Sequence, residues 1–353
     1  MKNALPQNSM EKTKANILNL SLSELEKWMA GHDEKPYRAR QVFGWLYQKL
    51  TADFELMTDL PANLRRELVQ NFVVPFPKIL RKIEAEDGAC KFLLELWDRE
   101  LIEAVLIPAE ETRETTLCLS VQVGCKYGCG FCRTATMGFK RNLESGEMLG
   151  EYLAVKSGLT SGAKIHRLVF MGMGEPLDNL EALKPALEIF CSRHGIGFSP
   201  RRITISTAGV VPALKAAWSL GCNLAVSLNA AENEKRKRLM PITRKYPLPS
   251  LLNSLRSLDL RARQKLTIEY VMLKAVNDSQ EDAQQLVKLL SGIEARVNLI
   301  RFNPFPGCVF RPSEEAQIFA FQNRLRQAGF RCFIRKSRGA EILAGCGQLA
   351  GSK

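Results

Sequence analysis

Short apolar runs alternate with longer amphipathic segments from about residue 115 to the end of the chain, and this alternation constrains the fold more than any other feature. The runs have the length of strands, and the segments between them have helical spacing. Strands that alternate with helices predict parallel βα units. The strand-like runs are TLCLSVQ, RLVFMGM, RITISTAG, LAVSLNA, TIEYVML, VNLIRF and CFIRK.

The number of these units limits the architecture. About six βα units are fewer than the eight of a closed barrel. We therefore expect an α/β fold with an open, partial (β/α)6 barrel over residues 111–353. Active-site residues of such a barrel gather at the C-terminal ends of its strands.

Two smaller regions precede the barrel. Residues 76–110 contain ILRKIEAE and CKFLLELW around Asp87-Gly88, followed by LIEAVLIP, which predicts a β-hairpin extension with a third strand. Residues 19–75 have helical spacing, with Ser21 as the first start signal and Gly31 as the first stop. Residues 1–18 are expected to be a flexible tail.

The residue 19–75 region carries interleaved cations. One interpretation is a small accessory domain that binds RNA, and the other is a solvated helical bundle without a ligand. The cations are Lys35, Arg38, Arg40, Lys49, Arg65 and Arg66.

The whole chain is basic, with 50 Lys and Arg against 37 Asp and Glu, a net charge of +13. This excess favours a polyanionic partner, because cations that neutralise phosphates release counterions. The alternative is a basic surface that serves only solubility. No apolar run reaches the roughly 18–20 residues that cross a bilayer. The polar start also lacks the apolar stretch of an export signal, so we expect a cytoplasmic protein without a membrane partner.

The ten cysteines do not indicate a disulfide scaffold, because the chain shows no export signal. Three of them lie close together as Cys125-Lys-Tyr-Gly-Cys129-Gly-Phe-Cys132, directly after a predicted strand. Three thiolates from one loop fill three corners of a four-iron cluster and leave one iron free for a substrate ligand. A zinc site is the alternative, but zinc sites usually add a second Cys-x2-Cys pair or histidines. No second pair is present here.

The C-x3-C-x2-C spacing resembles the hallmark of the radical S-adenosylmethionine (SAM) superfamily. Met171-Gly-Met-Gly-Glu175-Pro176 follows the next predicted strand, where that superfamily carries a glycine-rich motif for the SAM amino group. The resemblance implies one [4Fe-4S] cluster held by Cys125, Cys129 and Cys132. It also implies that the partial barrel is a radical SAM barrel.

A longer set of motifs resembles one family within that superfamily. VGCKYGCGFC, MGMGEPLDN, ITISTAGVVP, RFNPFPG and RGAEILAGCGQL are similar to the RlmN/Cfr family of RNA adenine methyltransferases, from roughly residue 20 to 350. The RlmN branch is the more similar one. It implies methylation of adenosine C2 in the peptidyl-transferase region of 23S rRNA and, in tRNA, 3′ to the anticodon. The Cfr branch acts at C8, and residue chemistry alone does not separate the two branches.

The family's chemistry assigns roles to three residues. An amidine carbon such as adenine C2 is electrophilic, so it cannot attack the SAM methyl group directly. In the family a C-terminal cysteine, here Cys346, first takes the methyl group, and a second SAM generates a radical that activates it for addition to RNA. By motif match, Glu103 is the base and Cys118 the thiol that attacks Cys346 and leaves a disulfide. Two SAM molecules are thus used per turnover.

Each of these residues also has a plainer interpretation. Cys118 lies in an apolar run, where a cysteine is most often part of the core. Glu103 alternates with apolar residues, so it could simply face solvent. Cys346 could be a surface thiol, although flanking Gly345 and Gly347 indicate a mobile loop.

The motif match also assigns the SAM contacts. Polar residues at successive strand ends are what a ligand site at the mouth of a barrel requires. Asn229 departs from the histidine usual in the family, and only seven residues follow Cys346. The assigned residues are Gly174, Glu175, Ser206, Ser227, Leu228, Asn229 and Asn303.

A basic run, Lys235-Arg-Lys-Arg238, follows one of these strand ends. It could grip phosphates, whereas charge runs are usually solvated faces. Two other function classes stay open at this point. One is a different radical SAM enzyme, and the other is an RNA- or ribosome-binding protein with a structural metal. We expect a monomer with 23S rRNA and tRNA as substrates and a flavodoxin-type electron donor.

Overall fold

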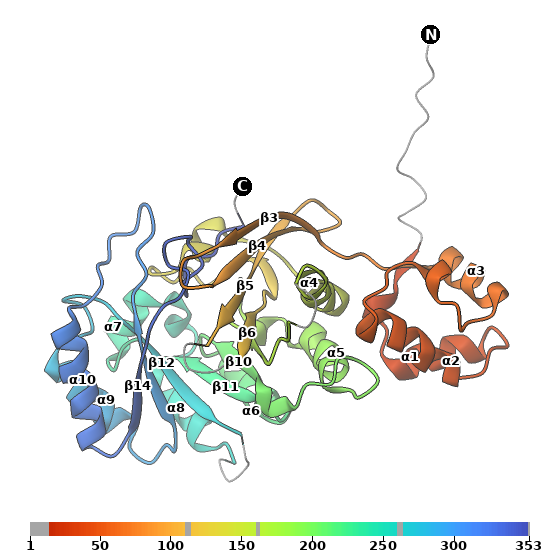
Figure 1. Cartoon of the computed structure of the whole chain (residues 1–353). Helices are drawn as coiled ribbons and strands as arrows, with labels where there is room; N and C mark the ends of the chain where they lie inside the picture. Colours follow the sequence, from red (N-terminus) through yellow and green to blue (C-terminus); the bar gives the residue numbers. More distant parts are fainter. Residues whose placement is uncertain (1–13, 110–113, 160–162, 260–263, 352–353) are drawn as a thin grey trace.

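The computed structural model describes residues 14–109, 114–159, 163–259 and 264–351. Within these ranges one ten-stranded sheet has the order β14-β13-β12-β11-β10-β9-β6-β5-β4-β3. Its two edge strands do not pair with each other there, so the sheet stays open (Figure 1). The expected α/β fold with a partial barrel is confirmed.

Seven neighbouring strands of this sheet, counted in the described ranges, run parallel and are joined by six helical crossovers. Their apolar residues are buried on both faces, as in a sheet covered by helices. The strands are β6 (Thr115–Cys118), β9 (Arg167–Phe170), β10 (Ile203–Thr207), β11 (Asn223–Ser227), β12 (Leu266–Met272), β13 (Arg296–Arg301) and β14 (Arg331–Arg335). The crossover helices are α4 (Ser145–Ser157), α5 (Leu180–Cys191), α6 (Leu214–Trp218), α7 (Asn233–Leu239), α8 (Leu248–Arg256), α9 (Gln280–Leu289) and α10 (Glu315–Gln327), with α7 and α8 in the same crossover.

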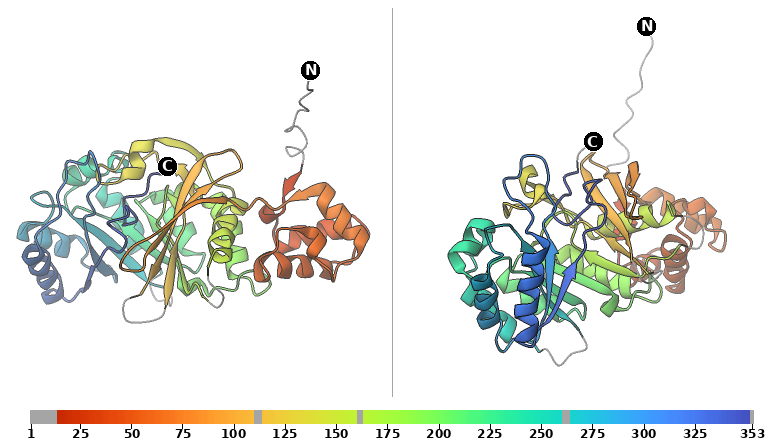
Figure 2. Two further views of the ribbon diagram at one scale, coloured as in Figure 1. Left: turned by 45° about the horizontal axis from the view of Figure 1, so that its top comes forward. Right: turned by 60° about the vertical axis from the view of Figure 1, so that its left-hand side comes forward.

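Three antiparallel strands extend the sheet beyond β6, as the sequence predicted. They are β5 (Leu101–Pro108), β4 (Cys90–Glu95) and β3 (Lys78–Glu84). Gly88 has a φ of +79° in the turn between β3 and β4, a backbone conformation that favours glycine. The extension crosses the top of the barrel near the C-terminus (Figures 1 and 2).

The N-terminal helices form a separate small layer on the side of α4 and α5, away from α9 and α10 (Figure 2). Ser21 caps α1 (Leu22–Ala30) through a capping box with Glu24, and the helix ends at Gly31, as predicted. α2 (Tyr37–Phe43) continues into a π-helical segment (Gly44–Gln48), and α3 (Ala62–Asn71) follows.

The expected tail differs from the structure at its C-terminal end. Ile17 and Leu18 are fully buried, and β1 (Ala15–Asn16) pairs with β2 (Phe72–Val73). Asn19 then accepts a hydrogen bond of 2.7 Å from the amide of Gly146 in α4. The packed part of the chain therefore begins before residue 18, whereas residues 1–13 lie outside the described ranges. No helix of the described residues is both long and apolar enough to cross a membrane.

Candidate active site

The cysteine loop, residues 125–138, is held between two short strands, β7 (Gln122–Gly124) and β8 (Phe139–Asn142), which pair with each other. The amide of Cys125 donates to the carbonyl of Gly138 over 2.8 Å. Gly124 has a φ of +75°, and a Cβ there would lie 1.8 Å from the carbonyl oxygen of Gly138. Only glycine fits at the start of this loop.

Cys125, Cys129 and Cys132 all line one cavity of about 230 Å³ at the C-terminal ends of the parallel strands. Burial raises the pKa of the Cys125 thiol to about 12 and raises those of Cys129 and Cys132 as well. These thiols therefore need a metal charge to ionise at neutral pH. Among the described residues no three ligand groups lie close enough to bind a single metal ion, and a four-iron cluster does not require this, because each thiolate binds a different iron.

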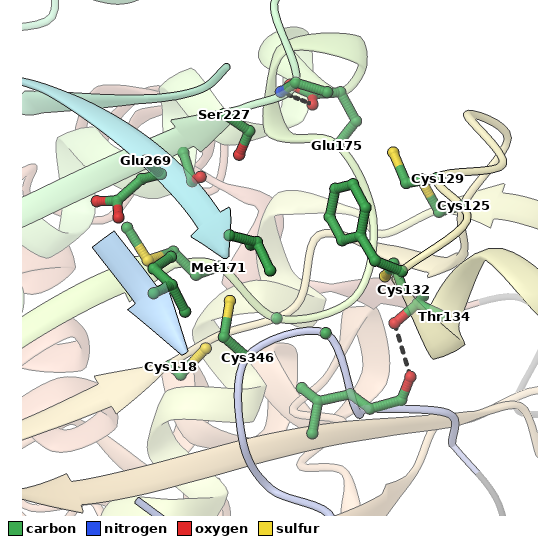
Figure 3. A pocket seen from close by; sticks show the side chains of 18 of the residues that line it. Cys118, Cys125, Cys129, Cys132, Thr134, Met171, Glu175, Ser227, Glu269 and Cys346 are labelled. Atoms are coloured by element: carbon green, nitrogen blue, oxygen red, sulfur yellow. Dashed lines mark hydrogen bonds between the residues drawn. The ribbon is translucent and has the colours of Figure 1, made fainter. Parts of the chain in front are cut away.

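The C-terminal loop, residues 344–351, lies against the cysteine loop. The carbonyl of Gly347 accepts from the amide of Arg133 over 2.7 Å, and that of Leu349 accepts from the Thr134 hydroxyl over 2.7 Å (Figure 3). A Cβ on Gly345 would lie 2.7 Å from the Asn303 amide nitrogen. The glycine at 345 is thus explained by close packing in this structure.

Cys346 lies at the tip of the C-terminal loop with its side chain in the cavity (Figure 3). Its exposed surface faces the cavity, and the surrounding protein still desolvates the sulfur. This burial raises the pKa of the Cys346 thiol to about 12, and the carboxylate of Glu269 adds to the effect. Asn303 positions the loop by donating to the carbonyl of Cys346 over 3.1 Å.

Cys118, at the end of β6, is buried and lines the same cavity. It packs in the core, as the apolar run predicted, and it also reaches the cavity. Burial raises the pKa of the Cys118 thiol, and negative charge on Cys346 raises it further. The two sulfurs lie on the same side of the cavity, across from Cys125 and Cys129 (Figure 3). All ten cysteines are free, so the disulfide implied by the family is not formed in this state.

Glu103, in β5, is 2% exposed, so the interpretation that it faces solvent is wrong. Its carboxylate accepts from the amides of Ala350 (2.7 Å) and Gly351 (3.2 Å) and pairs with Lys91 over 3.2 Å. It does not line the cavity. In this structure the C-terminal loop therefore covers the carboxylate.

Glu175 lines the cavity after β9 and is almost completely buried. Its two carboxylate oxygens accept from the amides of Leu177 (3.0 Å) and Ala208 (2.6 Å). Burial raises its pKa to about 7, and these hydrogen bonds oppose the rise. Gly174 has a φ of +98°, and a Cβ there would lie 2.5 Å from that of Gln122. The motif therefore lets its backbone approach the start of the cysteine loop.

The other assigned SAM contacts divide into two groups. Ser206, Ser227 and Asn229 line the cavity, whereas Leu228 and Asn303 do not. Asn229 has a φ of +59°, a conformation that asparagine tolerates better than most residues. Its side-chain oxygen accepts from the amide of Val271 over 2.8 Å, so this side chain already supports the neighbouring strand.

Two buried charged residues were missed by the sequence analysis. Glu269 is paired in register with Ser227 across β11 and β12, and its side chain lines the cavity. Burial raises the pKa of Glu269 to about 7. A glutamate inside the apolar run TIEYVML is the signal that could have revealed it. The second residue is Arg236, in the basic run.

The basic run is not a continuous phosphate-binding surface. Lys235 pairs with Asp282, Lys237 pairs with Glu234 over 3.3 Å, and Arg236 is fully buried. Arg238 is the exposed member of the four that has no ion pair among the described contacts. Burial of one arginine out of four could not be read from the charge pattern.

Known proteins match both parts of the chain. Residues 15–74 match the family described as "Ribosomal RNA large subunit methyltransferase N-terminal domain", and residues 119–289 match "Radical SAM superfamily". A crystal structure of a radical SAM methyltransferase from Sphaerobacter thermophilus is 38% identical with a TM-score of 0.89. The match covers 96% of this chain and 99% of the Sphaerobacter thermophilus chain.

Relatives match over nearly their full length. "Dual-specificity RNA methyltransferase RlmN" from Syntrophobacter fumaroxidans is 45% identical over 337 residues, covering 94% of this chain and 97% of the relative. The protein of the same name from Geobacter sulfurreducens is 45% identical over 342 residues, covering 96% and 93%.

An open parallel sheet with three cysteines in the loop after its first strand and a glycine-rich motif after its second defines a radical SAM enzyme. That class implies SAM and a four-iron cluster as cofactors, and a set of three thiols on one cavity wall fits such a cluster. The chain belongs to the RlmN family and is a SAM-dependent RNA methyltransferase.

Proposed function

We propose that this enzyme methylates C2 of adenosine in the peptidyl-transferase region of 23S rRNA and, in tRNA, 3′ to the anticodon. The observation that carries the proposal is that Cys346 and Cys118 share one cavity with Cys125, Cys129 and Cys132. Direct transfer from SAM to adenine C2 requires no cysteine pair, and it fails because this carbon is electrophilic. A pair of thiols beside the SAM site supports transfer through sulfur instead.

Cys125, Cys129 and Cys132 would hold the four-iron cluster, which supplies the electron that cleaves SAM to a 5′-deoxyadenosyl radical. Glu175 would accept from the SAM ammonium, because its carboxylate lies beside the cysteine loop in a dry environment. Ser206 and Ser227 present hydroxyls to the same cavity and would contact the rest of the cofactor. Gly174, Leu228, Asn229 and Asn303 would shape this site, mainly through their backbone and packing.

Cys346 would take the methyl group of one SAM, losing its thiol proton as the S–CH3 bond forms. A second SAM, the second of two per turnover, would provide the radical that removes a hydrogen atom from this methyl group. The remaining S–CH2 radical would add to adenine C2 and join the protein to RNA. The adduct would then give up one electron, which would return to the cofactor that supplied it. Glu103 would then take the C2 proton, once the C-terminal loop has moved off it.

Cys118 would complete the cycle. Its sulfur would attack that of Cys346, so that an S–S bond forms and the S–CH2 bond to RNA breaks, and the product carbon takes a proton to become a methyl group. The two thiols are thereby oxidised to a disulfide, which an external thiol reductant must reduce before the next turnover. Their shared position on one side of the cavity supports this exchange.

The N-terminal helices would bind RNA from beside the barrel. Tyr37 is 46% exposed, and Lys49 lies 3.3 Å from the ring centre of Trp45, which gives this surface both cations and aromatic rings. Such surfaces suit phosphates and unstacked bases. The enzyme would act as a monomer in the cytoplasm, with a flavodoxin-type protein as electron donor.

Mass spectrometry of adenosines from a strain that lacks this gene tests the proposal. We expect 2-methyladenosine to disappear from both 23S rRNA and tRNA and to return when the gene is restored. Loss from one RNA alone would restrict the substrate, and loss of 8-methyladenosine would instead assign the chemistry to C8. Unchanged methylation of both RNAs would refute the proposed function.

The thiol exchange has a separate test with purified enzyme. The Cys118→Ala variant should accumulate RNA covalently attached at Cys346, because the attached RNA cannot be released. Cys332→Ala, which removes a buried cysteine outside the cavity, is the matched control and should accumulate none. Absence of the adduct from Cys118→Ala, with normal turnover, would contradict the role of this thiol.

A further inference from the structure

Arg236, in α7, is the largest fully buried side chain of the described residues. Its guanidinium donates to the carbonyls of Leu228 (3.0 Å), Ala208 (2.6 Å) and Ser227 (3.0 Å) and to the hydroxyl of Thr243 (2.8 Å). All four acceptors are neutral. Within the described part of the chain no carboxylate forms an ion pair with it.

A buried cation without an anion is costly, because removal from water is not compensated by a nearby negative charge. Burial lowers the pKa of Arg236 to about 10, so it stays protonated at neutral pH. The ionisable group that acts on it in the opposite direction is the thiol of Cys129. Arg236 is thus a buried positive charge with four neutral acceptors, and the thiols of the cysteine loop would supply negative charge only when they bind a metal cluster.

The end of α7 and the residues that follow it contact the cysteine loop. The carbonyl of Leu239, at the end of the same helix, accepts from the amide of Gly130 over 3.0 Å. Pro241 lies next to Gly128, where an added Cβ would meet its ring at 3.8 Å. The segment 236–241 thus joins the loop that carries the thiols, through Leu239 and Pro241, to the strand ends after Ser206 and at Ser227, through Arg236.

We propose that Arg236 is the fixed positive charge that balances the cysteine-ligated cluster and makes its one-electron reduction easier. This inference rests on the proposed function, because it requires the cluster at Cys125, Cys129 and Cys132. Three thiolates give an oxidised four-iron cluster a net charge of about −1, and one electron from an external reductant makes it about −2. A cation held in a dry site stabilises the more negative form more strongly, and no bond is made or broken.

The competing interpretation is that Arg236 only ties strand ends together through hydrogen bonds. The two interpretations separate on charge. Lysine keeps the charge but cannot reproduce the four hydrogen bonds, whereas glutamine and methionine are unbranched at Cβ and remove the charge with a shorter side chain. Arg238→Gln is the matched control, because it removes an exposed cation two residues away in the same helix.

The experiment is anaerobic reconstitution of each variant, followed by iron and sulfide analysis and a redox titration monitored by electron paramagnetic resonance. At a fixed potential, the reduced-to-oxidised ratio should fall about tenfold in Arg236→Gln and Arg236→Met, which for one electron is about 59 mV. Arg236→Lys should stay within about threefold of wild type, and Arg238→Gln should be unchanged.

The outcomes separate a failure of the proposed function from a failure of the role of Arg236. Wild-type protein that binds no iron defeats the proposed function itself. Wild-type protein with a normal cluster, but with the same ratio in the Gln, Met and Lys variants, overturns only the role of Arg236. If the neutral variants hold no cluster, loading of Arg236→Lys supports the charge requirement, and failure of Arg236→Lys to load assigns Arg236 to hydrogen bonding alone.

Discussion

The cysteine loop and the C-terminal loop face each other across one cavity but are held in different ways. The cysteine loop is fixed by paired strands, by the Cys125–Gly138 backbone bond and by the buried Arg236 region. Within its described residues the C-terminal loop has no such strand pair. A backbone bond, from Arg133 to Gly347, holds it together with side chains of Thr134, Asn303 and Glu103. Side-chain bonds can be exchanged for bonds to a substrate, whereas a strand pair cannot. The difference indicates a fixed cofactor side and a releasable thiol side.

The largest effects should come from the thiols on the two sides. Cys125→Ala should lose both the iron and all methylation, because the cluster would lack a ligand. Cys346→Ala should keep its iron and still lose methylation by more than about 1000-fold, since the methyl carrier is gone. Iron analysis together with a methylation assay measures both effects. Loss of iron from Cys346→Ala would contradict the distinction between the cysteine loop and the C-terminal loop.

Backbone packing gives a second contrast. Gly124→Ala places a Cβ 1.8 Å from a backbone oxygen at a φ of +75°, so the loop must rearrange. We expect it to lower the free energy of unfolding by about 3 kcal/mol or more. Gly347→Ala meets its nearest atom at 3.2 Å at a φ of +82° and should cost about 1 kcal/mol. Urea unfolding measures both, and equal losses would contradict the distinction between a fixed and a releasable loop.

The anchor of the C-terminal loop offers a smaller and more local effect. Glu103→Gln keeps the shape but weakens charged hydrogen bonds to Ala350 and Gly351, which should destabilise the loop by about 1–2 kcal/mol. Hydrogen exchange of residues 344–351 should speed up about tenfold, while that of the cysteine loop stays unchanged. Equal acceleration in both loops would show that they open as one unit.

A last effect, spread over a range of pH, comes from two buried carboxyl groups. Glu175 and Glu269 each have a folded pKa of about 7, above the 4.5 of a free glutamate, so the folded protein binds more protons between these values. Stability of the metal-free protein should therefore be greatest below about pH 4.5 for these groups and fall as pH rises to 7, by up to about 3 kcal/mol for each group.

Urea unfolding at several pH values measures that slope, and the two variants assign it. Glu175→Gln should remove the part of the pH dependence that comes from the carboxyl group beside the cysteine loop. Glu269→Gln should remove the part that comes from the carboxyl group beside Cys346. A slope that neither variant changes would mean that other groups carry the pH dependence.

The site was only partly predictable from the sequence. Local motifs placed Cys118, Cys125, Cys129, Cys132, Glu175 and Cys346, because strand ends of a parallel sheet meet at one edge. Glu103 was identified by motif, but its burial under Ala350 and Gly351 depends on a contact between residues about 250 positions apart. Glu269 and Arg236 looked like an ordinary strand residue and one member of a charge run.

The sequence by itself determined the strand–helix alternation, the open sheet, the three-thiol loop and the glycines that permit its turns. These depend on side-chain periodicity and backbone preference, which act over a few residues. Only the tertiary structure decided that Arg236 is buried, that Glu103 is covered and that Cys346 shares a cavity with Cys118. Burial and charge compensation depend on which distant segments meet, and no local pattern encodes that.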